Sequence, residues 1–200
     1  MDTPYKNVDG KKYLIAFLLS LIPMAGIALA SSLALDQDLT DLVLTALTIF
    51  LMFRVVPEKP QFSRWSLLLL LAGLLVGLLV FRVRSAGSLD TIQVTTSNGL
   101  LGVAVFMFNA AVLTPIYEEK ACRQIMLFGL GKYLHIALSA VIVSVLFSVV
   151  HHGNEIFALV FSLIMSAFAA RGMSTFNRAI IHGGINLVQT ALWVYYGYKF

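Results

Sequence analysis

Eight apolar runs, most of them close to the length of a membrane-spanning helix, divide this chain. A helix needs about 20 apolar residues to cross a bilayer, whose hydrocarbon does not satisfy irregular backbone. The runs are 13–35, 40–56, 63–81, 98–114, 116–130, 132–151, 154–171 and 176–196. Only 12% of the 200 residues are charged, against about 25% in soluble domains. The sequence therefore predicts an all-α polytopic membrane bundle of about eight helices.

The basic residues are scattered singly near the ends of these runs. Although the formal net charge is +4, no basic stripe is present, so we expect membrane lipids and no nucleic acid as partners. The loop after the first run carries Asp36, Asp38 and Asp41 and no Lys or Arg. The segments on its two sides carry Lys6, Lys11, Lys12, Arg54, Lys59 and Arg64. Because basic residues favour the inner face, we predict a cytoplasmic N-terminus.

Pro115 divides the apolar sequence in the middle of the chain. Proline ends or kinks a helix, so a run that starts near Asn98 should stop there and a short new helix should begin. Gly129 and Gly131 should end that helix and start an antiparallel hairpin. Glu118 in the first arm then comes level with His151 at the end of the second.

Three pairs of polar or aromatic residues lie four positions apart on these apolar helices: Glu119 with Arg123, Phe147 with His151, and His182 with Asn186. Residues four apart share one face of a helix. A charged side chain at bilayer depth costs roughly 2.5–3.5 kcal/mol on insertion scales and is usually functional. His182 can join the other pairs only if the Gly153–Asn154 turn is sunk into the bilayer.

The three pairs resemble the motifs of a known family. Residues 118–123 read Glu-Glu-Lys-Ala-Cys-Arg (EExxxR), residues 147–151 match FxxxH, and residues 182–186 match HxxxN. In this order they resemble the CPBP or Abi family, which contains type II CAAX prenyl endopeptidases and bacterial bacteriocin-processing and self-immunity proteins. The chain departs from the common form at Cys122, where Phe is frequent, and at Gln124, where Gly is frequent.

The resemblance implies one membrane domain, with N-terminal transmembrane helices in 1–97 and the catalytic core helices in 98–196. It implies an intramembrane endopeptidase of a bacterial cell membrane, without a cofactor. Its substrate would be a membrane-associated peptide or a lipidated protein.

The roles that the resemblance implies agree with the chemistry of the side chains. Glu118 would take a proton from water, and His151 would hold and polarise that water. His182 and Asn186 would donate hydrogen bonds to the oxyanion. The supporting residues would be Glu119 and Arg123, which neutralise each other, and Phe147.

Four other functions stay open. The polar residues could form an interhelical clamp, or the carboxylates and histidines could bind a divalent metal such as zinc, although HExxH is absent. Acid and histidine relays also occur in proton-coupled transporters, but no inverted repeat is visible. A bacteriocin self-immunity or membrane binding protein could share the fold without proteolysis.

Overall fold

The computed structural model describes residues 8–33, 36–59, 61–85, 99–151 and 153–197. These residues form seven continuous helical segments and the turns between them. In chain order the elements are α1 (Gly10–Leu19), α2 (Ile22–Ser32), α3 (Gln37–Val55), α4 (Ser66–Ser85), α5 (Gly99–Phe108), η1 (Asn109–Leu113), α6 (Thr114–Glu118), η2 (Glu119–Met126), α7 (Leu127–Leu130), α8 (Ile136–Val149), α9 (Glu155–Ala170) and α10 (Thr175–Gly197). The all-α class is confirmed. The boundary expected between residues 97 and 98 lies outside the described residues.

The predicted break at Pro115 is wrong, so the described residues form seven helices where about eight were expected. Residues Gly99–Leu130 form one continuous rod in which α-helical and π-helical turns alternate. In η1 the N–H of Thr114 bonds to the carbonyl of Asn109, five residues back. The wider π turn accommodates the proline, which has no N–H to donate and would otherwise clash with the preceding turn. Glu118 therefore lies within a long helix rather than at the start of a short one.

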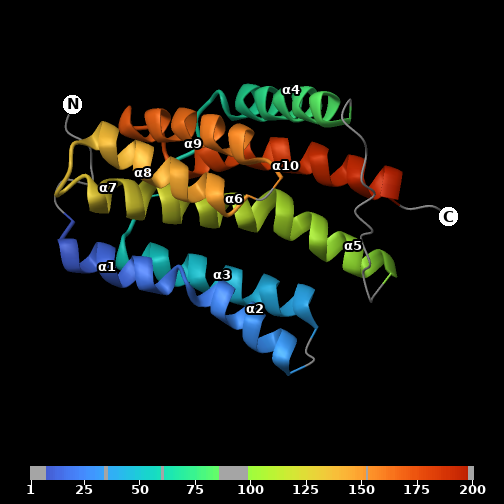
Figure 1. Cartoon of the computed structure of the whole chain (residues 1–200), viewed down its shortest axis with the longest axis horizontal. Helices are drawn as coiled ribbons and strands as arrows, with labels where there is room; N and C mark the ends of the chain where they lie inside the picture. Colours follow the sequence, from blue (N-terminus) through green and yellow to red (C-terminus); the bar gives the residue numbers. More distant parts are fainter. Residues whose placement is uncertain (1–7, 34–35, 60, 86–98, 152, 198–200) are drawn as a thin grey trace.

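Pairs of helices pack along one common axis in Figure 1. α2 packs on α3, α8 packs on α9, and α4 packs along α10. The contact between α4 and α10 is close because glycines line it: a Cβ atom at Gly73 would collide with the carbonyl oxygen of Ile181, and one at Gly184 would lie 3.0 Å from the carbonyl oxygen of Leu70. Small residues allow such backbone contact between membrane helices.

The hairpin of α8 and α9 is shorter than the helices beside it. α8 has 14 residues and α9 has 16, whereas the Gly99–Leu130 rod has 32 and α10 has 23. At 1.5 Å per residue, α8 is only about 21 Å long. The hairpin covers one end of α10 in Figure 1 and stops part-way along it. The Gly153–Asn154 turn, where Gly153 has φ of +78°, connects the two helices of this hairpin.

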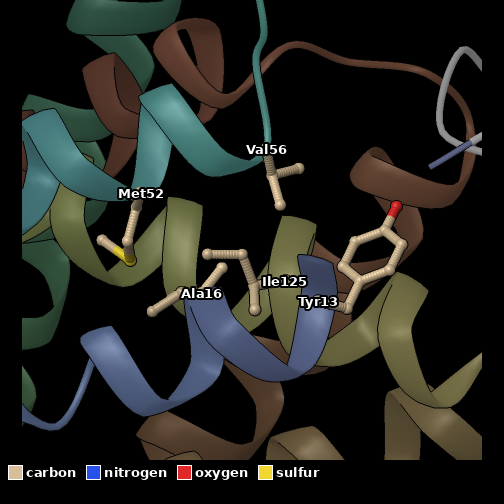
Figure 2. Packing of buried hydrophobic residues seen from close by; sticks show 6 residues of the cluster. Tyr13, Ala16, Met52, Val56 and Ile125 are labelled. Atoms are coloured by element: carbon tan, nitrogen blue, oxygen red, sulfur yellow. The ribbon is translucent and has the colours of Figure 1, made fainter. Parts of the chain in front are cut away.

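One apolar cluster joins the N-terminal helices to the central rod. Tyr13 and Ala16 of α1 pack with Met52 of α3, Val56 and Ile125 of η2, as Figure 2 shows. All five side chains are almost fully buried. This contact holds α1 and α3 against the segment that carries the Glu118–Glu119 pair.

The outer surface of the bundle is apolar. Large side chains such as Leu67, Leu75, Leu100 and Ile156 are mostly exposed. Soluble monomers rarely expose apolar patches of this extent. Among the described segments, Gly10–Ser32 and Gly99–Leu130 are long and apolar enough to cross a membrane. These features support a membrane location.

Candidate functional site

All four predicted catalytic side chains line one cavity. Glu118 ends α6, His151 follows the C-terminus of α8, and His182 and Asn186 lie one turn apart on α10. The cavity has a volume of about 230 Å³, and Phe147 forms part of its wall. The short hairpin and the unbroken rod thus bring together residues that are up to 68 positions apart, from Glu118 to Asn186.

Glu118 lies between two imidazole rings. Its Oε1 is 4.0 Å from Nε2 of His151, and its Oε2 is 3.5 Å from Nε2 of His182. The Oε2 atom is buried and has no hydrogen-bond partner. The 4.0 Å separation from His151 is longer than a direct hydrogen bond, so a water beside both atoms could bridge them. The carboxylate is therefore placed to share a water with His151.

His151 is oriented by its own helix. Its Nδ1 lies 2.6 Å from the carbonyl oxygen of Phe147, which can only accept, so Nδ1 carries the proton. In a neutral ring Nε2, which faces Glu118, is then a free acceptor. The ring also stacks on that of Phe147, with centroids 4.1 Å apart. The FxxxH pair acts as one unit in which Phe147 fixes the imidazole.

His182 connects the two neighbouring carboxylates. Its Nδ1 is 3.2 Å from Oε1 of Glu119, while Nε2 faces Glu118. Because a carboxylate only accepts, Nδ1 donates to Glu119. Nε2 can donate to a substrate only when the ring carries both protons, and Glu119 offers the counter-charge for that form.

Glu119 is fully buried and held by two arginines. Its Oε2 accepts a hydrogen bond of 3.1 Å from Nε of Arg178, and its Oε1 lies 3.7 Å from Nη1 of Arg123. Arg123 also lies over the Phe147 ring, with Cζ 4.3 Å from the centroid. Glu119 and Arg123 do not line the cavity. They meet outside it, and Glu119 reaches the cavity only through His182.

Asn186 is positioned by the π-helical turn. Its Nδ2 donates a hydrogen bond of 3.0 Å to the carbonyl of Ala110. That carbonyl is free because the N–H of Thr114 bonds to Asn109 instead. The second proton on Nδ2 remains for another acceptor. The irregular turn before Pro115 therefore supplies the acceptor that orients Asn186.

Comparison with known proteins assigns this region to a family. Residues 100–188 match the family described as Type II CAAX prenyl endopeptidase Rce1-like. The chain carries an Rce1-like domain. The matched segment contains all three motifs and the four predicted catalytic residues, and it confirms the resemblance to the CPBP family. Comparison with curated proteins and with solved structures found no match.

The two departures from the common motif lie away from the cavity of the Rce1-like domain. Gln124 is fully buried, and its Oε1 accepts hydrogen bonds from Lys120 and, at 3.3 Å, from Oγ1 of Thr175. Cys122 packs against two apolar clusters. Neither residue lines the site. The departures therefore alter the packing beneath the Rce1-like site rather than its wall.

The sequence did not predict the buried cations below the site. Arg178 is 1% exposed and holds Glu119. Lys120 is also fully buried; its Nζ donates to the carbonyl of Val56 at 2.7 Å and lies 3.5 Å from Oε2 of Glu58. Arg178 stands four residues before His182, and that spacing was the available signal, since it places both on one face.

A zinc site was one of the alternatives that the sequence left open. Within the part of the chain that the structure describes, no three His, Cys, Asp or Glu side chains gather as metal ligands. A structural or catalytic zinc needs three or four such ligands at about 2.0–2.3 Å.

Proposed function

We propose that the Rce1-like domain is a glutamic-type intramembrane endopeptidase in which Glu118 activates water. The observation that carries this proposal is the position of Glu118 between His151 and His182 in one cavity, with an unpartnered Oε2. The match of residues 100–188 to a family of endopeptidases also supports it.

In the proposed reaction, a water lies between Glu118 and Nε2 of His151. Glu118 takes one proton as the water oxygen attacks the scissile carbonyl carbon. The negative charge moves to the carbonyl oxygen, where Nδ2 of Asn186 and Nε2 of a doubly protonated His182 donate hydrogen bonds. Glu118 then returns its proton to the amine nitrogen as the C–N bond breaks. No covalent enzyme intermediate forms.

The substrate in this proposal is a membrane-associated peptide or a lipidated protein tail. The cavity is walled largely by aromatic and aliphatic side chains, among them Phe106, Phe157, Phe161, Ile185 and Trp193. Such a wall suits an apolar chain whose backbone meets a few polar groups.

We also propose that the N-terminus faces the cytoplasm of a bacterial cell. A membrane-impermeant thiol reagent should then not label a cysteine placed at Asp9 in intact cells carrying Cys122→Ala.

The test is cleavage of a peptide library by the purified protein in detergent. The wild type should generate new amino termini in apolar peptides, and Glu118→Ala should generate none. If neither protein cleaves, and cells carrying Glu118→Ala keep the biological function of the protein, the chain acts by association, as an immunity or binding protein would.

A further inference from the structure

A second, polar cavity adjoins the proposed catalytic one. Its volume is about 200 Å³, and it lies between α3 and the first half of the Gly99–Leu130 rod. Phe106, Ala110 and Thr114 line both cavities. The remaining walls are Asp41, Val105 and Asn109. The two cavities therefore lie next to each other along this rod.

Asp41 supplies a negative charge to this second cavity. Its Oδ2 accepts a hydrogen bond of 2.5 Å from Nδ2 of Asn109, and its Oδ1 accepts one of 3.2 Å from Oγ1 of Thr45. No lysine or arginine within the described ranges forms an ion pair with it. A carboxylate inside an apolar bundle is costly without a counter-charge.

Asn109 leaves a second acceptor without a partner. The side chain is only 8% exposed, and its Oδ1 makes no hydrogen bond. Since Asp41 can only accept, the amide nitrogen must face Asp41 and the amide oxygen must point elsewhere. Both residues line the cavity, whose described walls present the Asp41 carboxylate and no lysine or arginine. Buried polar groups are nearly always paired, so an unpaired one calls for a missing donor.

These contacts differ from those expected if Asp41 and Asn109 served only to hold two helices together. A clamp between α3 and η1 would need only the bond from Asn109 to Asp41, and it would bury both groups fully. Here Asp41 stays partly accessible and both residues line a cavity that meets the proposed active site. The complementary ligand is a group with several N–H donors and a positive charge, which a lysine or arginine side chain provides.

We propose that Asp41 and Asn109 form a specificity subsite for a basic side chain of the peptide held in the catalytic cavity. The identity of the ligand as a substrate rests on the proposed function. The ammonium or guanidinium group would pair with the Asp41 carboxylate and donate to Oδ1 of Asn109. An otherwise apolar segment with one basic residue at a fixed distance from the scissile bond would be preferred.

The test measures binding rather than cleavage. Fluorescent apolar decapeptides, each with one lysine at a different position, are titrated into purified Glu118→Gln protein in detergent. Matched peptides carry glutamine or glutamate at the same position. In one register the lysine peptide should bind about tenfold more tightly than its glutamine partner, because a charged hydrogen-bonded pair is gained. The glutamate peptide should bind most weakly.

Asp41→Asn in the same background should remove the preference for lysine while leaving binding of the glutamine peptide unchanged. Asp9→Asn, which neutralises an exposed carboxylate at the start of α1, should keep the preference. Equal binding of the lysine and glutamine peptides in every register would overturn the proposal, as would a preference that persists in Asp41→Asn.

The two proposals can fail separately in this design. A preference for lysine that depends on Asp41, in a protein whose wild type cleaves nothing, would support the subsite and refute the peptidase. Cleavage that depends on Glu118, with no effect of peptide charge, would refute the subsite and leave the peptidase.

Discussion

His182 links the groups that the sequence treated as separate. Its two ring nitrogens face Glu119 and Glu118, and Glu119 in turn is held by Arg178. The i, i+4 rule finds the Glu119–Arg123 pair because both residues lie on one helix. It cannot find a partner from another helix, so the second arginine and the contact to His182 were missed.

Substitutions in the proposed catalytic set should separate by role. We expect Asn186→Ala to lower the hydrolysis rate by 10²–10³, the usual cost of losing one oxyanion donor. His151→Ala and His182→Ala should leave no measurable hydrolysis, since each contacts Glu118. Initial rates on one cleaved peptide test this, with thermal unfolding as the control for folding. A wild-type rate of hydrolysis in Asn186→Ala would show that Asn186 does not stabilise the oxyanion.

Arg178 should act by positioning Glu119 and, through it, His182. Arg178→Gln leaves Glu119 with one arginine, so we expect the stability to fall by up to about 3–5 kcal/mol, the cost of breaking a buried pair. Arg178→Lys should recover stability but not the full kcat, because lysine cannot keep the bond from Nε. Arg171→Gln, which replaces an exposed arginine at the C-terminal end of α9, is the control. If Arg178→Gln and Arg171→Gln have the same stability and the same kcat, Arg178 does not position Glu119.

At the scale of single elements, the rod from Gly99 to Leu130 shows how a proline can lie inside a continuous helix that carries residues of the site. The π turn of η1 removes the clash that Pro115 would cause, and it frees the carbonyl of Ala110 for Asn186. Gly183 fits against the neighbouring carbonyl of Ala111, where a Cβ atom would collide. One irregular turn thus fixes both the register of Glu118 and the direction of Asn186.

Pro115→Ala should therefore reduce activity without unfolding the helix. The new N–H can bond to the carbonyl of Ala111 and favour regular α geometry, which shifts Glu118 against Asn186. A misplacement of about 1 Å can cost 10²-fold in rate. Far-UV circular dichroism should stay unchanged while kcat falls. Pro23→Ala, at the start of α2, should leave kcat unaltered. An undiminished kcat in Pro115→Ala would show that the turn does not position the site.

At the scale of the whole molecule, hydropathy alone predicts the all-helical class and most of the helix positions. The number of helices could not be predicted, because whether a proline breaks a helix depends on the turn before it. The residues of the site could be chosen from motif spacing, since EExxxR, FxxxH and HxxxN each mark one helix face. The burial of Lys120 and Arg178 was not predicted, because basic residues near segment ends usually lie in loops. For Arg178 the only signal was its spacing of four residues from His182.

The proposed chemistry also predicts how the whole protein responds to chelators. Hydrolysis should survive dialysis against strong chelators and should not rise when zinc is added, because Glu118 itself activates the water. Elemental analysis of the same samples provides the control. Stoichiometric zinc that is lost together with activity would show that a metal, and not Glu118, activates the attacking water.

The central claim is that the carboxylate of Glu118 takes the proton from the attacking water. The most direct test compares kcat/KM of the wild type and Glu118→Gln on one cleaved peptide, with binding of that peptide measured in both proteins. The substitution keeps the shape of the side chain and removes the base. The account predicts equal peptide binding and no product above the uncatalysed background in Glu118→Gln. Turnover within tenfold of the wild type would contradict it.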